Sequence, residues 1–192
     1  IIPKFELVNY AVDLAPLERS RYDRISREIQ DLEREIKHSR EFLSMSRRGR
    51  GGNDFRVIRS LASGNRSPGI QAKAARYDRL VTDRKRLLYA ARSRNDCLVS
   101  VLEKELAEGS QIIVFHEVIE RIDELFHDLS RRFPVVLYHS KLTDTIRDEA
   151  LRLYWKGTAR VILSARALIE GYNVPSTDVG IIAASSSSPR QR

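Results

Sequence analysis

Polar side chains follow each of four short apolar runs in the second half of the chain. They are His116 and Glu117 after the first run, His139, Ser140 and Lys141 after the second, Ser164 and Arg166 after the third, and the serines 185–188 after the fourth. Ligands of a parallel sheet bind outside the carboxyl ends of its strands, where hydroxyls, backbone amides and helix N-termini suit phosphate oxygens. We therefore expect these residues to line a phosphate-binding edge. Neither histidine has a Ser-His-Asp or Cys-His pattern nearby, which favours packing or hydrogen bonding at the strand ends over catalysis.

The elements that would position these residues lie in residues 108–192. Nearly uninterrupted apolar runs alternate there with amphipathic segments, as parallel strands covered by helices require. The expected strands are 111–115, 135–138, 160–163 and 179–183, and the expected helices are 119–129 and 143–155, the second with an N-cap at Thr143. This pattern predicts an α/β domain with a parallel sheet and helices on both faces.

Residues 1–107 have a different pattern, in which apolar residues recur at three-to-four spacing and predict helices. The expected helical segments are 16–44, 55–61 and 70–106, separated by the Gly- and Arg-rich loops 47–52 and 63–69. Two long helices joined by a basic tip predict an antiparallel, coiled-coil-like hairpin. We therefore divide the chain into a helical region, 1–107, and an α/β domain, 108–192.

The net charge supports the same division. The chain has 34 Lys and Arg against 26 Asp and Glu, a net charge of +8. Residues 1–107 hold 23 basic and 15 acidic side chains, whereas residues 108–192 hold 11 of each. A basic excess favours polyanionic partners, and Arg47, Arg48 and Arg50 at the expected tip are candidates for salt-sensitive contact with nucleic-acid phosphates.

Composition also excludes several classes of protein. A single cysteine, Cys97, which we expect to be buried, rules out intrachain disulfides and CxxC zinc sites and favours a reducing, intracellular compartment: cytoplasmic in a prokaryote, nuclear in a eukaryote. The four histidines show no metal-ligand spacing, so we expect no metal site. No apolar run is long enough to cross a membrane, so we expect no membrane association. Because the sequence begins at Ile1 without Met, we expect it to be part of a longer chain.

Five segments of the second half resemble, in order and spacing, the second RecA-like lobe of superfamily-2 helicases and translocases. They are 111–117 (QIIVFHE), 139–151 (HSKLTDTIRDEAL), 154–157 (YWKG), 161–175 (VILSARALIEGYNVP) and 178–192 (DVGIIAASSSSPRQR). The XPB-like branch is the most similar. The resemblance implies a RecA-like sheet that forms one half of an ATP-driven motor acting on DNA or RNA.

The resemblance also implies roles for single residues. Those that would face the ATP cleft are Glu170, Gly171 and Asn173, and those that would contact the nucleic-acid backbone are His139, Ser140, Lys141, Ser164 and Arg166. Motif V of the family usually begins with Thr or Ser. Ala165 holds that position here, and Ser164 lies one residue earlier.

Other parts of the family's ATP site do not occur in this sequence. Residues 64–69 have the glycine spacing of a GxxxxGK[ST] loop, but Ile70 and Gln71 hold the places of its Lys and Ser or Thr. The Gln-Arg-x-Gly-Arg core of motif VI would begin beyond Arg192. We therefore expect no catalytic residue and no bound cofactor in this chain alone. ATP and Mg²⁺ would be used by a full-length protein that includes an N-terminal RecA-like lobe.

The sequence thus predicts the C-terminal motor lobe of an ATP-dependent DNA helicase or translocase, inactive by itself. Its partners would be DNA or RNA and the N-terminal lobe. The alternative is a non-enzymatic module whose helical hairpin docks a protein partner and whose helicase lobe is degenerate.

Overall fold

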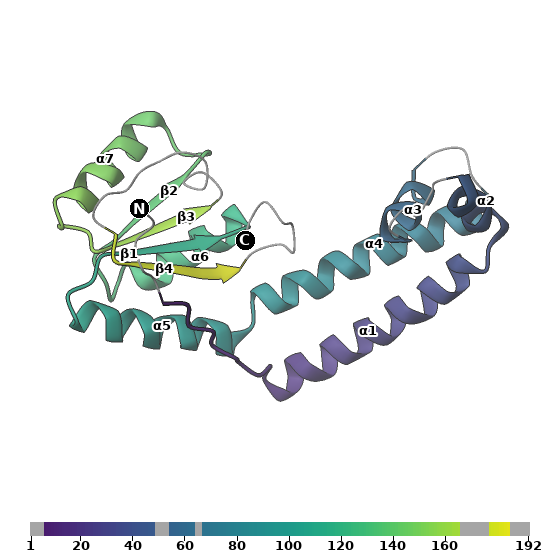
Figure 1. Cartoon of the computed structure of the whole chain (residues 1–192), viewed down its shortest axis with the longest axis horizontal. Helices are drawn as coiled ribbons and strands as arrows, with labels where there is room; N and C mark the ends of the chain where they lie inside the picture. Colours follow the sequence, from purple (N-terminus) through teal and green to yellow (C-terminus); the bar gives the residue numbers. More distant parts are fainter. Residues whose placement is uncertain (1–5, 49–53, 64–66, 166–176, 185–192) are drawn as a thin grey trace. The chain divides into compact units, whose positions relative to one another are not determined.

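The computed structural model describes residues 6–48, 54–63, 67–165 and 177–184 (Figure 1). The chain forms two compact units. One is helical and comprises Asp13–Arg92, and the other comprises Ile1–Val12 with Ser93–Arg192 and contains the sheet. The longer segment of the sheet unit therefore begins at Ser93, whereas the division expected from charge lies between Ala107 and Glu108. Among the described residues, no helix is long and apolar enough to cross a membrane.

Two long helices form the body of the helical unit. Helix α1 is Pro16–Lys37 and helix α4 is Pro68–Tyr89; each has a proline in its first turn, where a missing N–H costs nothing. They pack against each other and run in opposite directions (Figure 1), which confirms the expected hairpin. Ala15 at the N-cap of α1 has no side-chain acceptor, but its N–H donates to Oε2 of Glu18 at 3.0 Å.

The first helix is shorter than expected. The prediction of one helix over 16–44 is wrong, because α1 ends at Lys37 and a second helix, α2, covers Arg40–Arg48. Ser39 accounts for the break: its Oγ accepts the N–H of Phe42 at 3.2 Å and so starts a new helix. Helix α3 (Asp54–Leu61) confirms the short helix expected over 55–61.

The helical unit has a core of its own. Ten buried side chains from α1 to α4 form one cluster, and Ile36, Ile58, Leu61 and Ala74 are fully buried in it. Ion pairs connect the elements around this core. Lys73 of α4 pairs with Glu35 of α1 at 2.8 Å, and Lys37 of α1 pairs with Asp54 of α3 at 2.8 Å.

The prediction of one helix over 70–106 is also wrong. Helix α4 ends at Tyr89, and helix α5 covers Arg92–Ala107. Leu98 and Leu102 of α5 are buried in the same cluster as Ile112 and Val114 of the sheet. Helix α5 is therefore part of the sheet unit. Cys97, which we expected to be buried, is partly exposed on α5.

The sheet has four parallel strands in the order β2-β3-β1-β4. Their bounds are Ile112–His116 for β1, Val135–His139 for β2, Val161–Ala165 for β3 and Val179–Ala184 for β4. All four expected strands are thus present, shifted by a residue or two at their ends. The parallel direction of β1, β2 and β3 agrees with the helical connections between them, Ile119–Leu129 and Asp144–Trp155.

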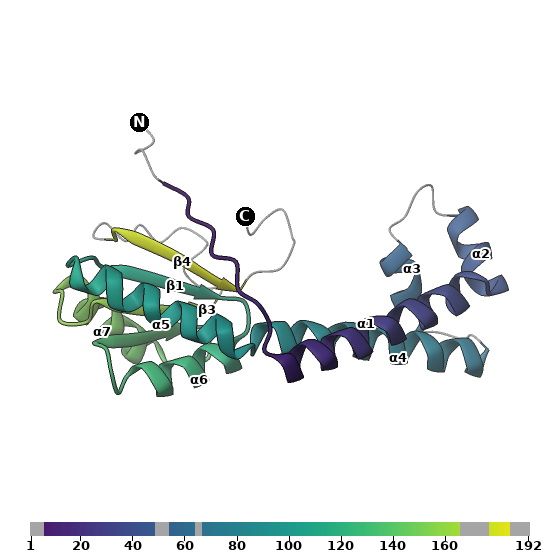
Figure 2. The ribbon, with the colours of Figure 1, turned by 90° about the horizontal axis from the view of Figure 1, so that it is seen from below.

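Helices cover both faces of this sheet, as expected for the α/β class. Helix α6 (Ile119–Leu129) and helix α5 pack on the face that receives Ile112 and Val114 of β1. Helix α7 (Asp144–Trp155) packs on the other face, against Ile113 and Ile162. Figure 1 shows α5 and α7 on opposite sides of the sheet, and Figure 2 looks from the side that α5 covers.

Candidate functional site

The carboxyl ends of neighbouring strands lie level with one another. His139 at the end of β2 is opposite Ala165 at the end of β3, and Ala165 is opposite His116 at the end of β1. His116 is in turn opposite Ala184 of β4, next to an irregularity in the ladder. The segments that follow the strands therefore begin along one edge of the sheet, as the sequence predicts.

His139 is buried at this edge and fixes the turn that follows it. Its side chain is 3% exposed, and its Nε2 lies 2.9 Å from Oδ1 of Asp123 on α6. The backbone N–H of Lys141 donates to Nδ1 at 3.2 Å, so Nε2 carries the proton donated to Asp123. Both ring nitrogens are occupied by protein groups. His139 therefore orients the next residues and does not itself reach a ligand.

Ser140 and Lys141 are exposed beyond this buried ring. The Nζ atom of Lys141 lies 2.6 Å from Oε1 of Glu120, and this hydrogen bond raises the pKa of Lys141. The ammonium group is therefore charged near neutral pH. Because both partners are mostly exposed, the ion pair adds little stability.

The start of α7 lies two residues beyond Lys141. Thr143 is its N-cap, and Oγ1 accepts the N–H of Ile146 at a long 3.5 Å, which confirms the expected cap. The first backbone N–H groups of a helix carry partial positive charge and attract anions. Asp144 in the first turn opposes this field, but it forms an ion pair with Arg147. A hydroxyl, an ammonium group and a helix N-terminus thus lie close together in the sequence after β2.

Ser164 has a different environment from the one expected of a nucleic-acid contact. Its side chain is fully buried, and in the register it lies between Phe115 and Tyr138. Within the part of the chain that the structure describes, its Oγ has no hydrogen-bond partner. In this conformation Ser164 is closed to a ligand.

The residues expected at the ATP cleft follow β3. Arg166, Glu170, Gly171 and Asn173 all lie outside the described residues. The chain is described again from Thr177, whose Oγ1 lies 3.0 Å from the hydroxyl of Tyr154.

Two further bonds fix the start of β4. The backbone N–H of Gln111 donates to Oδ2 of Asp178 at 2.8 Å, and the Gln111 side chain donates to the carbonyl of Tyr154 at 2.8 Å. Gln111 thus joins the end of α7 to the start of β4.

His116 at the end of β1 is buried and holds the following turn. Its Nδ1 accepts the N–H of Val118 at 3.0 Å. Burial lowers the pKa of His116 to about 4, although the nearby backbone carbonyl of Val118 acts in the opposite direction. The ring is therefore neutral near pH 7. His116 and His139 both confirm the interpretation as hydrogen-bonding groups at strand ends.

The arginines expected at the hairpin tip are described only in part. Arg47 and Arg48 end helix α2, and Arg50 lies outside the described residues. Within the described ranges, no three His, Cys, Asp or Glu side chains come together as a metal site would need.

Sequence reasoning missed two acidic partners at the strand edge. Asp123 and Glu120 both lie on α6, and they bind His139 and Lys141. Glu120 lies in the first turn of α6, where acidic residues are common in any helix. Its residue type therefore did not indicate that it pairs with Lys141. Asp123 follows the buried Ile122, and nothing in one sequence distinguishes it from a solvated helix residue.

Comparison with known proteins places this geometry in a family. Residues 93–192 match the family model of the helicase conserved C-terminal domain. A comparison with curated proteins gives no match. Among solved structures, the C-terminal part of the Fun30 ATPase domain is similar with a TM-score of 0.61 and 14% identity, covering 97% of this chain and 77% of that one.

Two longer solved structures are also similar. The Pyrococcus furiosus Hef helicase domain has a TM-score of 0.58 and 12% identity, covering 91% of this chain and 48% of that one. The Sulfolobus solfataricus SWI2/SNF2 ATPase core in complex with dsDNA has a TM-score of 0.56 and 14% identity, covering 90% of this chain and 33% of that one. These identities support the fold alone. The chain belongs to the helicase conserved C-terminal domain family, and the match covers the sheet unit from Ser93 onward.

Proposed function

We propose that this chain is the second motor lobe of an ATP-dependent DNA helicase or translocase of the XPB-like branch. The full protein would hydrolyse ATP with Mg²⁺ between this lobe and an N-terminal RecA-like lobe. The family match supports the lobe assignment. The similar Sulfolobus ATPase core was solved with double-stranded DNA, which supports DNA over RNA as the first polymer to test.

The observation that carries this proposal is the set of exposed groups after β2. Ser140, Lys141 and the N-terminus of α7 follow one another within six residues of the sequence. They come directly after His139, whose buried ring is hydrogen-bonded to Asp123. A backbone phosphate would receive hydrogen bonds from the hydroxyl and the amides and a positive charge from Lys141. None of these donors reads a base, so binding would be independent of sequence.

The other half of the proposal concerns ATP. Glu170, Gly171 and Asn173 would face the nucleotide, in the connection between β3 and β4. Each cycle of closure and opening between the two lobes would move the strand held after β2. The helical hairpin would act as a coiled-coil-like arm that guides or separates strands. This chain alone would bind nucleotide feebly and would not hydrolyse it.

DNA binding by the chain tests the proposal directly. We expect the double variant Ser140→Ala with Lys141→Ala to weaken binding to an arbitrary-sequence duplex and to a single strand, measured by fluorescence anisotropy over a salt series. Lys156→Ala is the matched control, since Lys156 is exposed at the opposite end of α7. Equal affinities of the double variant and the control would reject the strand-end site.

Activity requires the complete motor. In the full-length protein, we expect ATP hydrolysis to be stimulated by DNA, and the same double variant to reduce that stimulation. Absence of any nucleic-acid-stimulated hydrolysis would overturn the motor proposal. Absence of DNA binding at low salt would instead favour the protein-docking module.

A further inference from the structure

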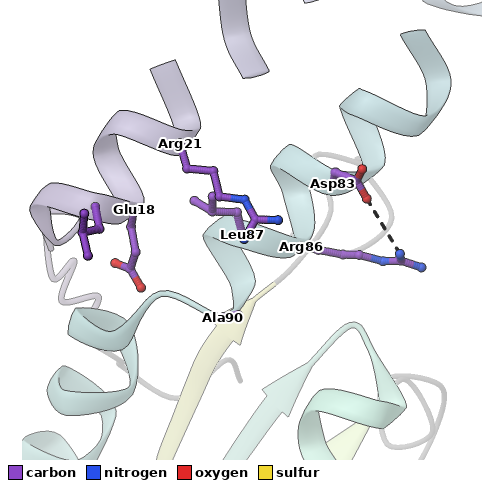
Figure 3. A pocket seen from close by; sticks show the side chains of 7 residues that line it. Glu18, Arg21, Asp83, Arg86, Leu87 and Ala90 are labelled. Atoms are coloured by element: carbon purple, nitrogen blue, oxygen red, sulfur yellow. Dashed lines mark ion pairs between the residues drawn. The ribbon is translucent and has the colours of Figure 1, made fainter. Parts of the chain in front are cut away.

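The two arms of the helical hairpin form a pocket of about 530 Å³ near the start of α1 and the end of α4. Leu17 and Arg21 of α1 line it from one side, and Arg86 and Leu87 of α4 line it from the other (Figure 3). Asp83 also lines the pocket and forms an ion pair with Arg86 at 3.9 Å. Each arm thus contributes one arginine to the lining of this pocket.

Two stripes of residues extend from this pocket along the hairpin. They are Leu17, Arg21, Arg24 and Glu28 on α1, and Arg76, Arg79, Asp83 and Arg86 on α4. Spacings of three and four keep each stripe on one side of its helix. The pocket joins the stripes at one end, and an ion pair between Glu28 and Arg76 joins them farther along. We call this double stripe the arginine face.

The arginine face has a positive charge that its own acids do not neutralise. Glu28 is paired with Arg76, and Asp83 is paired with Arg86. Arg21, Arg24 and Arg79 are exposed, and among the described residues none of them forms an ion pair. Three guanidinium groups of the arginine face are therefore exposed and outside any ion pair among the described residues.

The rest of the helical unit cannot supply the missing acids. Residues 13–92 contain 20 basic and 11 acidic side chains. Six of these acids form ion pairs elsewhere in the unit: Asp13 with Arg19, Asp31 with Arg34, Glu35 with Lys73, Asp54 and Glu33 with Lys37, and Asp78 with Arg59. Glu18, inside the pocket, accepts the backbone N–H groups of Ala15 and Arg92 at 3.0 Å each. The excess charge therefore has to be balanced from outside the unit.

We propose that the arginine face binds the phosphate backbone of a nucleic acid, as a second contact surface in addition to the strand-end site. Arg79 and Arg86 are about 10 Å apart along α4, at 1.5 Å per residue, and Arg21 and Arg24 add two charges on the neighbouring arm. A ladder of guanidinium groups on two rigid helices suits regularly spaced phosphates. This inference rests on the proposed function, because it assigns a further part of the same nucleic acid to this chain.

The test compares two triple variants of the whole chain. Arg21→Gln, Arg24→Gln and Arg79→Gln remove the unpaired charges of the arginine face. Arg27→Gln, Arg34→Gln and Arg59→Gln remove the same net charge from residues outside the two stripes. Glutamine keeps helix propensity close to that of arginine, and circular dichroism checks that both variants fold. A further triple variant, Arg21→Lys, Arg24→Lys and Arg79→Lys, keeps the charge of the face.

We expect the face variant to lose at least tenfold in affinity for duplex or single-stranded DNA, measured by anisotropy. Its slope of log affinity against log salt should decrease by about 2 to 3, because each phosphate contact contributes about 0.9. The control variant and the lysine variant should stay close to wild type. If the face variant and the control variant lose DNA affinity equally, the loss follows from net charge alone, and the inference is overturned.

The strand-end variant separates this inference from the proposed function. If Ser140→Ala with Lys141→Ala weakens binding and the face variant does not, the inference fails and the proposed function stands. If neither variant changes binding, both fail. If the chain binds an acidic protein such as poly-glutamate but no DNA, the arginine face belongs to a protein-docking surface and the inference is wrong.

Discussion

The Nε2 atom of His139 lies 2.9 Å from Oδ1 of Asp123, so a carboxylate of α6 contacts the last residue of β2. The opposite ring nitrogen accepts the backbone N–H of Lys141 at 3.2 Å, and the carbonyl of His139 accepts the N–H of Leu142 at 3.1 Å. Helix α6 therefore determines, through one buried ring, the direction of the residues that we propose to hold a phosphate. Asp123 acts as a positioning residue.

Removal of the Asp123 carboxylate should affect both stability and DNA binding. In Asp123→Ala the buried Nε2–H of His139 loses its acceptor. The free energy of unfolding, measured by urea titration, should therefore fall by about 1 to 2 kcal/mol. DNA affinity should fall as well, because the turn after β2 loosens. Asp123→Asn keeps an acceptor oxygen and should retain most of both properties. Glu124→Ala, on the same helix but paired with Arg121, is the control; a loss as large as that of Asp123→Ala would contradict the prediction.

Acid should destabilise the fold through His116. Burial lowers its pKa to about 4, below the usual 6.5, so between these values the unfolded chain binds a proton that the folded chain does not. The stability present above pH 6.5 is therefore lost as the pH falls towards 4, by up to about 3 kcal/mol. Urea unfolding at several pH values measures this loss.

His116→Asn should flatten that pH dependence, because an asparagine oxygen can accept the N–H of Val118 without titrating. His127→Asn is the control, since His127 is exposed on α6. An unchanged slope between pH 4 and 6.5 in His116→Asn would assign the acid sensitivity to other groups.

The sheet was predictable from the sequence because its strands are buried on both faces. In β3 every residue from Val161 to Ala165 is buried, and such a strand has a continuous apolar run with few alternative interpretations. The helices were predictable in position and less so in length. The break at Ser39 had a signal, a serine that caps the next helix, whereas the break after Tyr89 falls in Ala90 and Ala91, which are ordinary helix residues.

The site was less predictable than the fold. The level strand ends follow from parallel pairing, and so the position of Ser140 and Lys141 could be anticipated. The roles within the site depend on tertiary contacts. His139 and Ser164 have the residue types of ligand contacts, but both are buried, His139 against Asp123 and Ser164 between two aromatic neighbours. One sequence does not reveal which strand-end side chains the helices cover.

The hydroxyls of Tyr154 and Thr177 should stabilise the return of the chain into β4. They lie 3.0 Å apart, and Tyr154 is fully buried, which raises the pKa of its hydroxyl. Tyr154→Phe and Thr177→Val should each cost about 1 kcal/mol in urea unfolding. Combining them should cost less than the sum, because the second change removes a group already left without its partner. Full additivity would show that the two hydroxyls do not interact.

Each unit should respond to cavities in its own core. Ile36 is fully buried in the cluster of α1 to α4, and Ile162 is fully buried between the sheet and α7. Truncation of either to alanine should cost about 2 to 5 kcal/mol within its unit. Hydrogen exchange measured by mass spectrometry should then accelerate in α1 to α4 for Ile36→Ala and in β1 to β3 with α7 for Ile162→Ala, because local opening follows the cooperative unit. If either variant accelerates exchange equally in both units, the chain unfolds as one cooperative body, and the two cores do not act separately.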